Sequence, residues 1–168
     1  QDLLQKYNVP VPRYTSYPPA NYFTEAFANK EYESAIEASN TARPEHISFY
    51  VHIPFCIRKC AYCDFVSGPG TKAMQKEYEE ALLAEIDAAE ETAEREVISV
   101  FFGGGTPSAV DAGMLARVME KLRSKYVFSE DAEITLEANP GTLDAEKLKC
   151  YRKSGFNRIS IGCQSVHD

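Results

Sequence analysis

The sequence predicts an α/β domain built on a parallel sheet with helical crossovers. Short apolar runs typical of strands alternate with longer segments in which apolar residues recur at helical spacing, giving four strands and three helices. The length of 168 residues and the hydrophobic content of 44% suit one ordinary domain with a core. In such a sheet, whether open or closed into a barrel, binding sites gather at the carboxyl ends of the strands.

The first part of the chain, residues 1–45, is expected to form an arm and a helix that precede the sheet. Residues 1–23 have little helical periodicity and are punctuated by prolines, which predicts an extended arm. A surface helix is expected from Thr24, as its N-cap, to about Asn40. The apolar residues that set its spacing are Phe27, Tyr32 and Ile36.

The alternation of strands and helices begins after residue 45. Strands are expected at residues 47–53, 97–102, 132–137 and 156–162, and helices at 72–95, 111–126 and 143–154. A cysteine-rich loop follows the first strand, a glycine-rich turn at residues 103–108 follows the second, Glu137 ends the third, and Gln164 follows the fourth. Because the carboxyl ends of parallel strands share one edge, we expect these four features to lie together.

The cysteine-rich loop carries three thiols, Cys56, Cys60 and Cys63, in C-x3-C-x2-C spacing. Iron–sulfur clusters are held by cysteine thiolates at comparably short intervals. Three ligands to a four-iron cluster would leave one iron open for chemistry, by analogy with open zinc sites. A Cys3His zinc set that includes His52 is the alternative, although His52 sits back on the strand and reaches the thiols only if the chain folds back.

Composition argues against several other classes of protein. The net charge of -7 and the pI of about 5.1 give no basic field for a phosphate backbone, so nucleic acid is not an expected partner. No membrane span or signal segment is expected either, which favours a cytoplasmic location. Five cysteines, an odd number, do not indicate a disulfide framework, and Cys150 and Cys163 are expected to pack as small hydrophobic residues.

Together these motifs resemble the radical S-adenosylmethionine (SAM) superfamily, whose cysteine signature carries an aromatic residue, here Tyr62, before the third cysteine. More narrowly, residues 50–65, 103–108 and 133–141 are similar to the oxygen-independent coproporphyrinogen III oxidase family, which includes a related haem chaperone. The resemblance implies a partial (β/α)6 barrel. The chain is then expected to be a fragment, in which residues 46–168 supply the N-terminal part of the barrel, about four strands, after the extended arm and helix.

The resemblance also implies the cofactors. In this superfamily the three cysteines hold a [4Fe-4S] cluster, and the open iron is chelated by the amino and carboxylate groups of SAM. An electron from the reduced cluster cleaves SAM to methionine and a 5'-deoxyadenosyl radical, which abstracts hydrogen from the substrate. A protein such as flavodoxin or ferredoxin supplies the electron. The residues implied as SAM contacts are Tyr50, Tyr62, Gly104, Gly105, Thr106, Glu137 and Gln164.

Without the resemblance, two of these features have plainer interpretations. The glycine run matches no nucleotide-binding pattern, and it could simply be a tight turn between a strand and a helix. Glu137 shares strand parity with Glu133 and Thr135, which is also typical of a solvated strand face.

The two ends of the chain resemble different branches of the family. Residues 12–18 are similar to the arm of the true oxidases, which decarboxylate two propionates of coproporphyrinogen III to the vinyl groups of protoporphyrinogen IX. The oxidases carry a further cysteine two residues after the third ligand. Phe65 stands there in this chain. Together with residues 103–108 and 159–165, this departure looks more like the haem-chaperone branch, which binds haem and lacks the oxidase activity. The expected partner is therefore a tetrapyrrole substrate or haem, and no residue is assigned as a catalytic acid or base.

Overall fold

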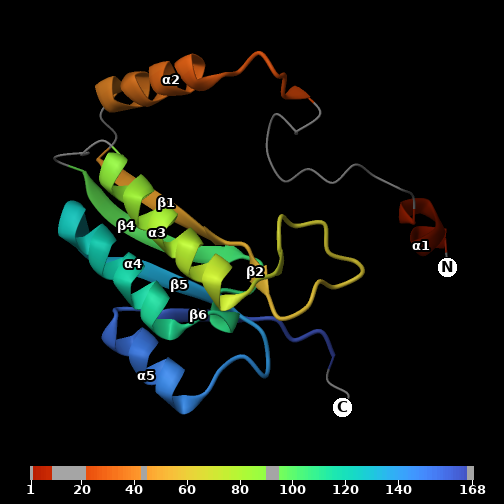
Figure 1. Ribbon diagram of the computed structural model, residues 1–168. Helices are drawn as coiled ribbons and strands as arrows, with labels where there is room; N and C mark the ends of the chain where they lie inside the picture. The colour runs from red at the N-terminus through yellow and green to blue at the C-terminus, as the bar shows by residue number, and fades with distance from the viewer. Residues whose placement is uncertain (1, 9–21, 43–44, 90–94, 166–168) are drawn as a thin grey trace. The chain divides into compact units, whose positions relative to one another are not determined.

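The computed structural model describes residues 2–8, 22–42, 45–89 and 95–165 (Figure 1). The chain divides into two compact units, Gln1–Ala42 and Arg43–Asp168. The first contains the helix α1 (Asp2–Tyr7), which replaces the beginning of the expected extended arm. The proline-rich part of the arm, residues 9–21, lies outside the described residues.

The second helix of this unit, α2 (Asn29–Ala42), begins four residues later than the sequence predicted. Thr24 does not cap it, because residues 24–27 form a turn in which the Phe27 amide donates to the Thr24 carbonyl at 3.4 Å. The Glu31 carboxylate instead accepts a hydrogen bond from the Ala28 amide at 3.1 Å, just before the first helical residue. None of its described side chains is buried, which agrees with the predicted surface helix.

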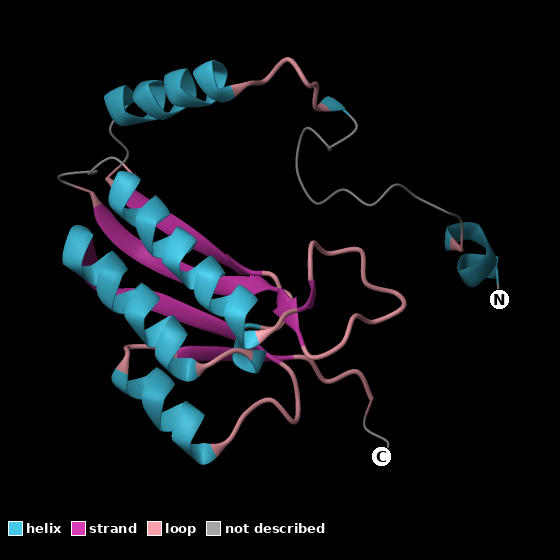
Figure 2. Ribbon diagram, viewed as in Figure 1, coloured by secondary structure: helices cyan, strands magenta, loops and turns pink. Residues whose placement is uncertain are grey.

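The second unit is built on a four-stranded parallel sheet, which confirms the predicted fold class (Figure 2). The strands are β1 (His46–Ile53), β4 (Glu96–Gly104), β5 (Val127–Ala138) and β6 (Arg158–Ile161). They lie side by side in the order in which they follow one another along the chain. All their carboxyl ends therefore meet at one edge.

Helices α3 (Lys72–Ala88), α4 (Ala112–Lys125) and α5 (Ala145–Lys153) connect these strands and lie side by side on one face of the sheet (Figure 1). Each begins at a side-chain cap, and the capping residues are Thr71, Asp111 and Asp144. The prediction that the first of these helices runs to residue 95 was wrong. Ala89 is extended, and Lys125 Nζ donates to the carbonyls of Ile86 at 2.8 Å and Asp87 at 2.7 Å, which closes the helix there.

The hydrophobic core lies between this helical layer and the sheet. Its fully buried members include Ile53, Val97, Phe102, Leu115, Leu122, Ile134, Leu136 and Tyr151. On the strands these residues alternate with a second set that shares the opposite face. In register across the sheet, that set places Tyr50 beside Phe101, Phe101 beside Thr135, and Thr135 beside Arg158.

A second, much smaller parallel pair was not predicted. It consists of β2 (Phe55–Cys56) and β3 (Gly68–Pro69), two residues each. The Gly68 amide also donates to the Pro54 carbonyl at 2.9 Å. This pair joins the two ends of the cysteine loop, which projects from the carboxyl edge of the sheet (Figure 1). Across the described ranges, no helix combines the length and the apolar character that crossing a membrane requires.

Candidate functional site

A pocket of about 310 Å³ lies at the carboxyl edge of the sheet, where sequence reasoning placed the site. The loop after β1 contributes Cys56, Cys60, Tyr62 and Cys63. Gly104, Gly105 and Thr106 line it from the end of β4, Glu137 from β5, and Gln164 from the segment after β6. The structure thus gathers on one pocket all the residues predicted to hold a cofactor except Tyr50. They come from the carboxyl ends of the four parallel strands or from the segments that follow those ends, as the parallel topology requires.

The three cysteines are supported unequally. Cys56 belongs to β2, and it points away from Phe55 because neighbouring strand residues face opposite sides. Cys60 and Cys63 lie on the loop, where the Cys63 amide donates to the Cys60 carbonyl at 3.1 Å. Cys60 is exposed, whereas the other two are half-buried. Cys56 therefore has a fixed backbone position, and the other two depend on the loop.

The three thiols are ligands of the type that a multi-iron cluster requires. Three thiols face one pocket, and a four-iron cluster binds each thiolate through a different iron, so its ligands stay farther apart than those of a single ion. Among the described residues, no three His, Cys, Asp or Glu side chains are grouped closely enough to hold a single metal ion.

His52 does not line the pocket, so the geometry gives no support to the zinc alternative. Its Nε2 lies 2.8 Å from the Val66 carbonyl and its Nδ1 lies 3.4 Å from the Tyr50 hydroxyl. Both ring nitrogens therefore have partners away from the thiols.

The glycine run packs directly on the cysteine strand. The Gly105 amide donates to the Ile53 carbonyl and the Thr106 amide to the Phe55 carbonyl, each at 2.8 Å. A Cβ at Gly105 would lie 2.8 Å from the Phe55 carbonyl oxygen and 2.9 Å from Cys56 Sγ. The backbone can approach this closely only because residue 105 is glycine, so the run is more than a plain turn.

Thr106 connects this turn to the first cysteine. Its side chain is 5% exposed, and its hydroxyl donates to Cys56 Sγ at 3.6 Å. The Asn139 side-chain amide, which also lines the pocket, donates to the Thr106 hydroxyl oxygen at 3.1 Å. Sequence reasoning gave Asn139 no role. The available signal was its place directly after Glu137 and Ala138 at the end of the third strand.

Lys147 joins the loops on the other side of Asn139. Its Nζ donates to the carbonyls of Ser108 at 2.7 Å, and of Val110 and Thr142 at 3.2 Å each. The Ser108 hydroxyl in turn accepts a hydrogen bond from the Asn139 amide at 3.3 Å. One lysine on α5 therefore holds the loops after β4 and β5 together, beneath the pocket.

Tyr50 and Glu137 lie on either side of Gly103. A Cβ there would lie 3.0 Å from both Glu137 Oε2 and the Tyr50 ring. Tyr50 is 60% exposed and stacks on Phe101, with ring centroids 6.1 Å apart. Partial burial and the nearby Glu137 carboxylate raise the pKa of Tyr50, which keeps the phenol neutral. Its predicted contact with SAM stays a prediction.

The exposed end of the pocket is lined by Tyr62, Arg58 and Phe65. The Tyr62 hydroxyl hydrogen-bonds to the Cys60 sulfur, and this bond is the main cause that raises the pKa of Tyr62. Phe65, which occupies the position of the oxidases' further cysteine, is 66% exposed. Phe65 lies on the cysteine loop, and it takes no part in the hydrogen bonds by which Gly105 and Thr106 support the strand of Cys56.

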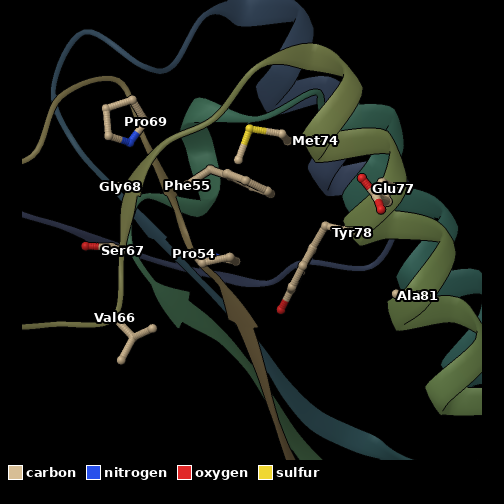
Figure 3. Close-up of a pocket in the computed structure, with 10 residues that line it drawn as sticks. All are labelled: Pro54, Phe55, Val66, Ser67, Gly68, Pro69, Met74, Glu77, Tyr78 and Ala81. Carbon is tan, nitrogen blue, oxygen red and sulfur yellow. The ribbon is translucent and has the colours of Figure 1, made fainter.

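A larger pocket, of about 590 Å³, lies on the other side of the β2 strand (Figure 3). Phe55 points into it, with Met74 and Tyr78 of α3 beside it. The Phe55 and Tyr78 rings meet edge to face at 5.5 Å, and the Tyr78 hydroxyl donates to the His52 carbonyl at 2.6 Å. No cysteine lines this pocket, so it does not include the predicted cofactor ligands.

The two isolated cysteines behave differently from each other. Cys150 is half-buried and packs against the core, as expected. The expectation for Cys163 was wrong, because it is exposed in the segment after β6, where its thiol donates to the Ser165 carbonyl at 3.4 Å.

Comparison with known proteins identifies the family to which the chain is similar. The model of the Radical SAM superfamily matches residues 50–168. The chain is 41% identical to the oxygen-independent coproporphyrinogen III oxidase of Escherichia coli (strain K12) over 98% of this chain and 36% of that protein. It is 44% identical to the heme chaperone HemW of Buchnera aphidicola over 72% of this chain and 33% of that protein. The chain thus spans about a third of the length of these relatives.

A solved structure agrees with the sequence matches. The E. coli coproporphyrinogen III oxidase (HemN), described as a radical SAM enzyme, superposes with a TM-score of 0.83 at 34% identity. The match covers 99% of this chain and 37% of that one. The α/β fold predicted from sequence, and its likeness to the N-terminal part of a radical SAM structure, are therefore confirmed.

Proposed function

The chain belongs to the radical SAM superfamily, and from that premise we propose that the protein is an oxygen-independent coproporphyrinogen III oxidase. One observation carries the choice within the family. The alignment with the E. coli oxidase covers 98% of this chain, including its N-terminal unit, whereas the alignments with HemW of Buchnera and of E. coli cover 72% and 73%. The arm and helix of residues 1–45 then belong to the oxidase, ahead of a barrel that begins at residue 46.

The proposed roles of the residues follow from the pocket. Cys56, Cys60 and Cys63 hold a [4Fe-4S] cluster that, when bound, supplies the electron that cleaves SAM. Gly104 and Gly105 present bare backbone to the methionine part of SAM, because no side chain obstructs the approach there. The Glu137 carboxylate and the Gln164 amide, at neighbouring strand ends, accept and donate hydrogen bonds to the remaining polar groups of SAM.

Three further contacts complete the proposed site. Thr106 orients the first cysteine, Tyr62 covers the exposed end, and neutral Tyr50 lies towards the SAM carboxylate beside Glu137. A small electron-transfer protein such as flavodoxin or ferredoxin supplies the electron. The proposed substrate is coproporphyrinogen III, and the proposed location is the cytoplasm.

The second candidate function is haem binding and delivery, as in the HemW relatives. Phe65 favours it, since the oxidase pattern has a cysteine at this position. The 44% identity to the Buchnera protein over the barrel part also favours it.

The deciding experiment is anaerobic incubation of the reconstituted full-length protein with coproporphyrinogen III, SAM and a reductant. An oxidase forms protoporphyrinogen IX, and the Cys63→Ala variant forms none. SAM cleavage without protoporphyrinogen, together with a Soret shift on haem titration, would replace the oxidase by the chaperone. A colourless protein with bound zinc would refute both candidates.

A further inference from the structure

We propose that Asn139 and Thr106 form a hydrogen-bond relay to Cys56 that raises the reduction potential of the bound cluster. The inference rests on the proposed cluster ligation, and it deepens it by giving Asn139 the role of a positioning residue. The relay is made of two hydrogen bonds, from Asn139 Nδ2 to Thr106 Oγ1 at 3.1 Å and from Thr106 Oγ1 to Cys56 Sγ at 3.6 Å.

The first bond sets the direction of the second. A threonine hydroxyl has one proton to donate and lone pairs to accept. Because Asn139 donates to the oxygen, the lone pair on that side is used, and the hydroxyl proton is left to point towards the Cys56 sulfur. Asn139 therefore acts on the cysteine through Thr106 without touching the sulfur.

The surroundings make this bond effective. Thr106 is only 5% exposed, so water competes weakly for its hydroxyl. Its amide is fixed to the Phe55 carbonyl at 2.8 Å, next to the cysteine that it supports. The Tyr62 hydroxyl also hydrogen-bonds to the Cys60 sulfur, but Tyr62 is 77% exposed. The buried relay should therefore influence the cluster more than the exposed tyrosine does.

The chemical effect follows from charge. Adding one electron to a cluster increases the negative charge shared with its thiolate ligands. A hydrogen-bond donor to a ligating sulfur stabilises that added charge, and hydrogen bonds to the sulfurs are among the factors that set the potential. The relay thus favours the reduced form and makes reduction by an external electron donor easier.

The test uses the full-length protein, reconstituted anaerobically and titrated potentiometrically while electron paramagnetic resonance follows the reduced cluster. SAM is left out, because both residues also line its proposed pocket. Thr106→Val removes the hydroxyl at nearly constant shape and should shift the midpoint potential to more negative values. Asn139→Leu should shift it in the same direction by less. Thr106→Ser keeps the hydroxyl and should retain the wild-type potential.

The outcomes separate this proposal from the proposed function. A Thr106→Val protein that carries the cluster at the wild-type potential would overturn the relay. If that variant binds no cluster, Asn139→Leu decides: an unchanged potential overturns the relay, and a negative shift supports it. Loss of the cluster in both variants would reduce the two residues to structural supports and would also overturn it. A wild-type protein that takes up no iron would refute the proposed function itself.

Discussion

Replacing Gly105 with alanine should damage the proposed cluster site, because the added methyl group would press on the strand that carries Cys56. The added Cβ would lie 2.8 Å from the Phe55 carbonyl oxygen and 2.9 Å from Cys56 Sγ. Ordinary contact begins at about 3.4 Å, so the cysteine strand and the turn must separate by roughly half an ångström. Overpacking of this kind costs about 1–3 kcal/mol of unfolding free energy. It acts directly on a ligand, and loss of such support typically lowers metal affinity about 10–100-fold.

The matched control is Gly68→Ala, on the partner strand of Cys56, where a Cβ would meet nothing within 4 Å. Urea unfolding of the apoproteins and iron and sulfide content after reconstitution would be compared. We expect Gly105→Ala to lose stability and most of its iron, and Gly68→Ala to match the wild type. A Gly105→Ala protein with full iron content and unchanged unfolding would refute the reasoning about close approach.

Three further predictions concern side chains of the helices α4 and α5. Arg117 donates to the Glu79 carboxylate at 2.5 and 3.0 Å, and the Glu79 side chain is 11% exposed against 53% for Arg117. Arg117→Met leaves the buried carboxylate without its partner and should lower the free energy of unfolding by about 2–3 kcal/mol. Glu79→Gln should lower it by only about 1 kcal/mol, because water can solvate the exposed arginine. Equal losses for the two variants in urea unfolding would contradict this. Tyr151 is 1% exposed, and its hydroxyl has no hydrogen-bond partner among the described residues, so Tyr151→Phe should leave stability at pH 7 unchanged or raise it by about 1 kcal/mol. Burial raises the pKa of Tyr151 from 10.0 to about 12, so above pH 10 the unfolded state ionises first. The free energy of unfolding should then fall by up to about 1.4 kcal/mol per pH unit towards pH 12. If the Tyr151→Phe protein loses stability between pH 10 and pH 12 as steeply as the wild type does, ionisation of Tyr151 is not the cause. Lys147→Met removes three hydrogen bonds to loop carbonyls and should speed amide hydrogen exchange in residues 106–111, whereas unchanged exchange there would rule out its joining role.

The edge of the sheet that carries the site could be predicted from the sequence, because that prediction needs only the order of strands and helices. Parallel strands bring their carboxyl ends together whatever their exact bounds, so Glu137 and the glycine run reach one pocket. The first and last residues of each strand were harder to predict from the sequence. The strand expected at residues 132–137 runs over Val127–Ala138, since pairing of Glu96 with Val127 extends it through polar residues that carry no strand pattern.

Contacts between residues distant in sequence were beyond the reach of local patterns. Two residues on each side, Phe55–Cys56 and Gly68–Pro69, are too few to show a strand period. The bond from Asn139 to Thr106 joins two loops that are 33 residues apart. An asparagine before a proline is in addition typical of an ordinary turn, so its side chain gave no separate signal.

The unequal support of the cysteines bears on the choice between oxidase and chaperone. Cys56 is held by β2, by the close approach of Gly105 and by Thr106. The rest of the loop is held by side chains at its far end: Lys59 Nζ donates to the Phe65 carbonyl at 2.5 Å and to the Ser67 hydroxyl at 3.1 Å, and His52 Nε2 lies 2.8 Å from the Val66 carbonyl. Phe65 therefore stands on the adaptable side of the pocket, away from the bonds that fix Cys56. A Phe65→Cys substitution can add the oxidases' cysteine without disturbing those bonds. If product formation changes in that variant while iron content does not, residue 65 governs the reaction and not the assembly of the cluster.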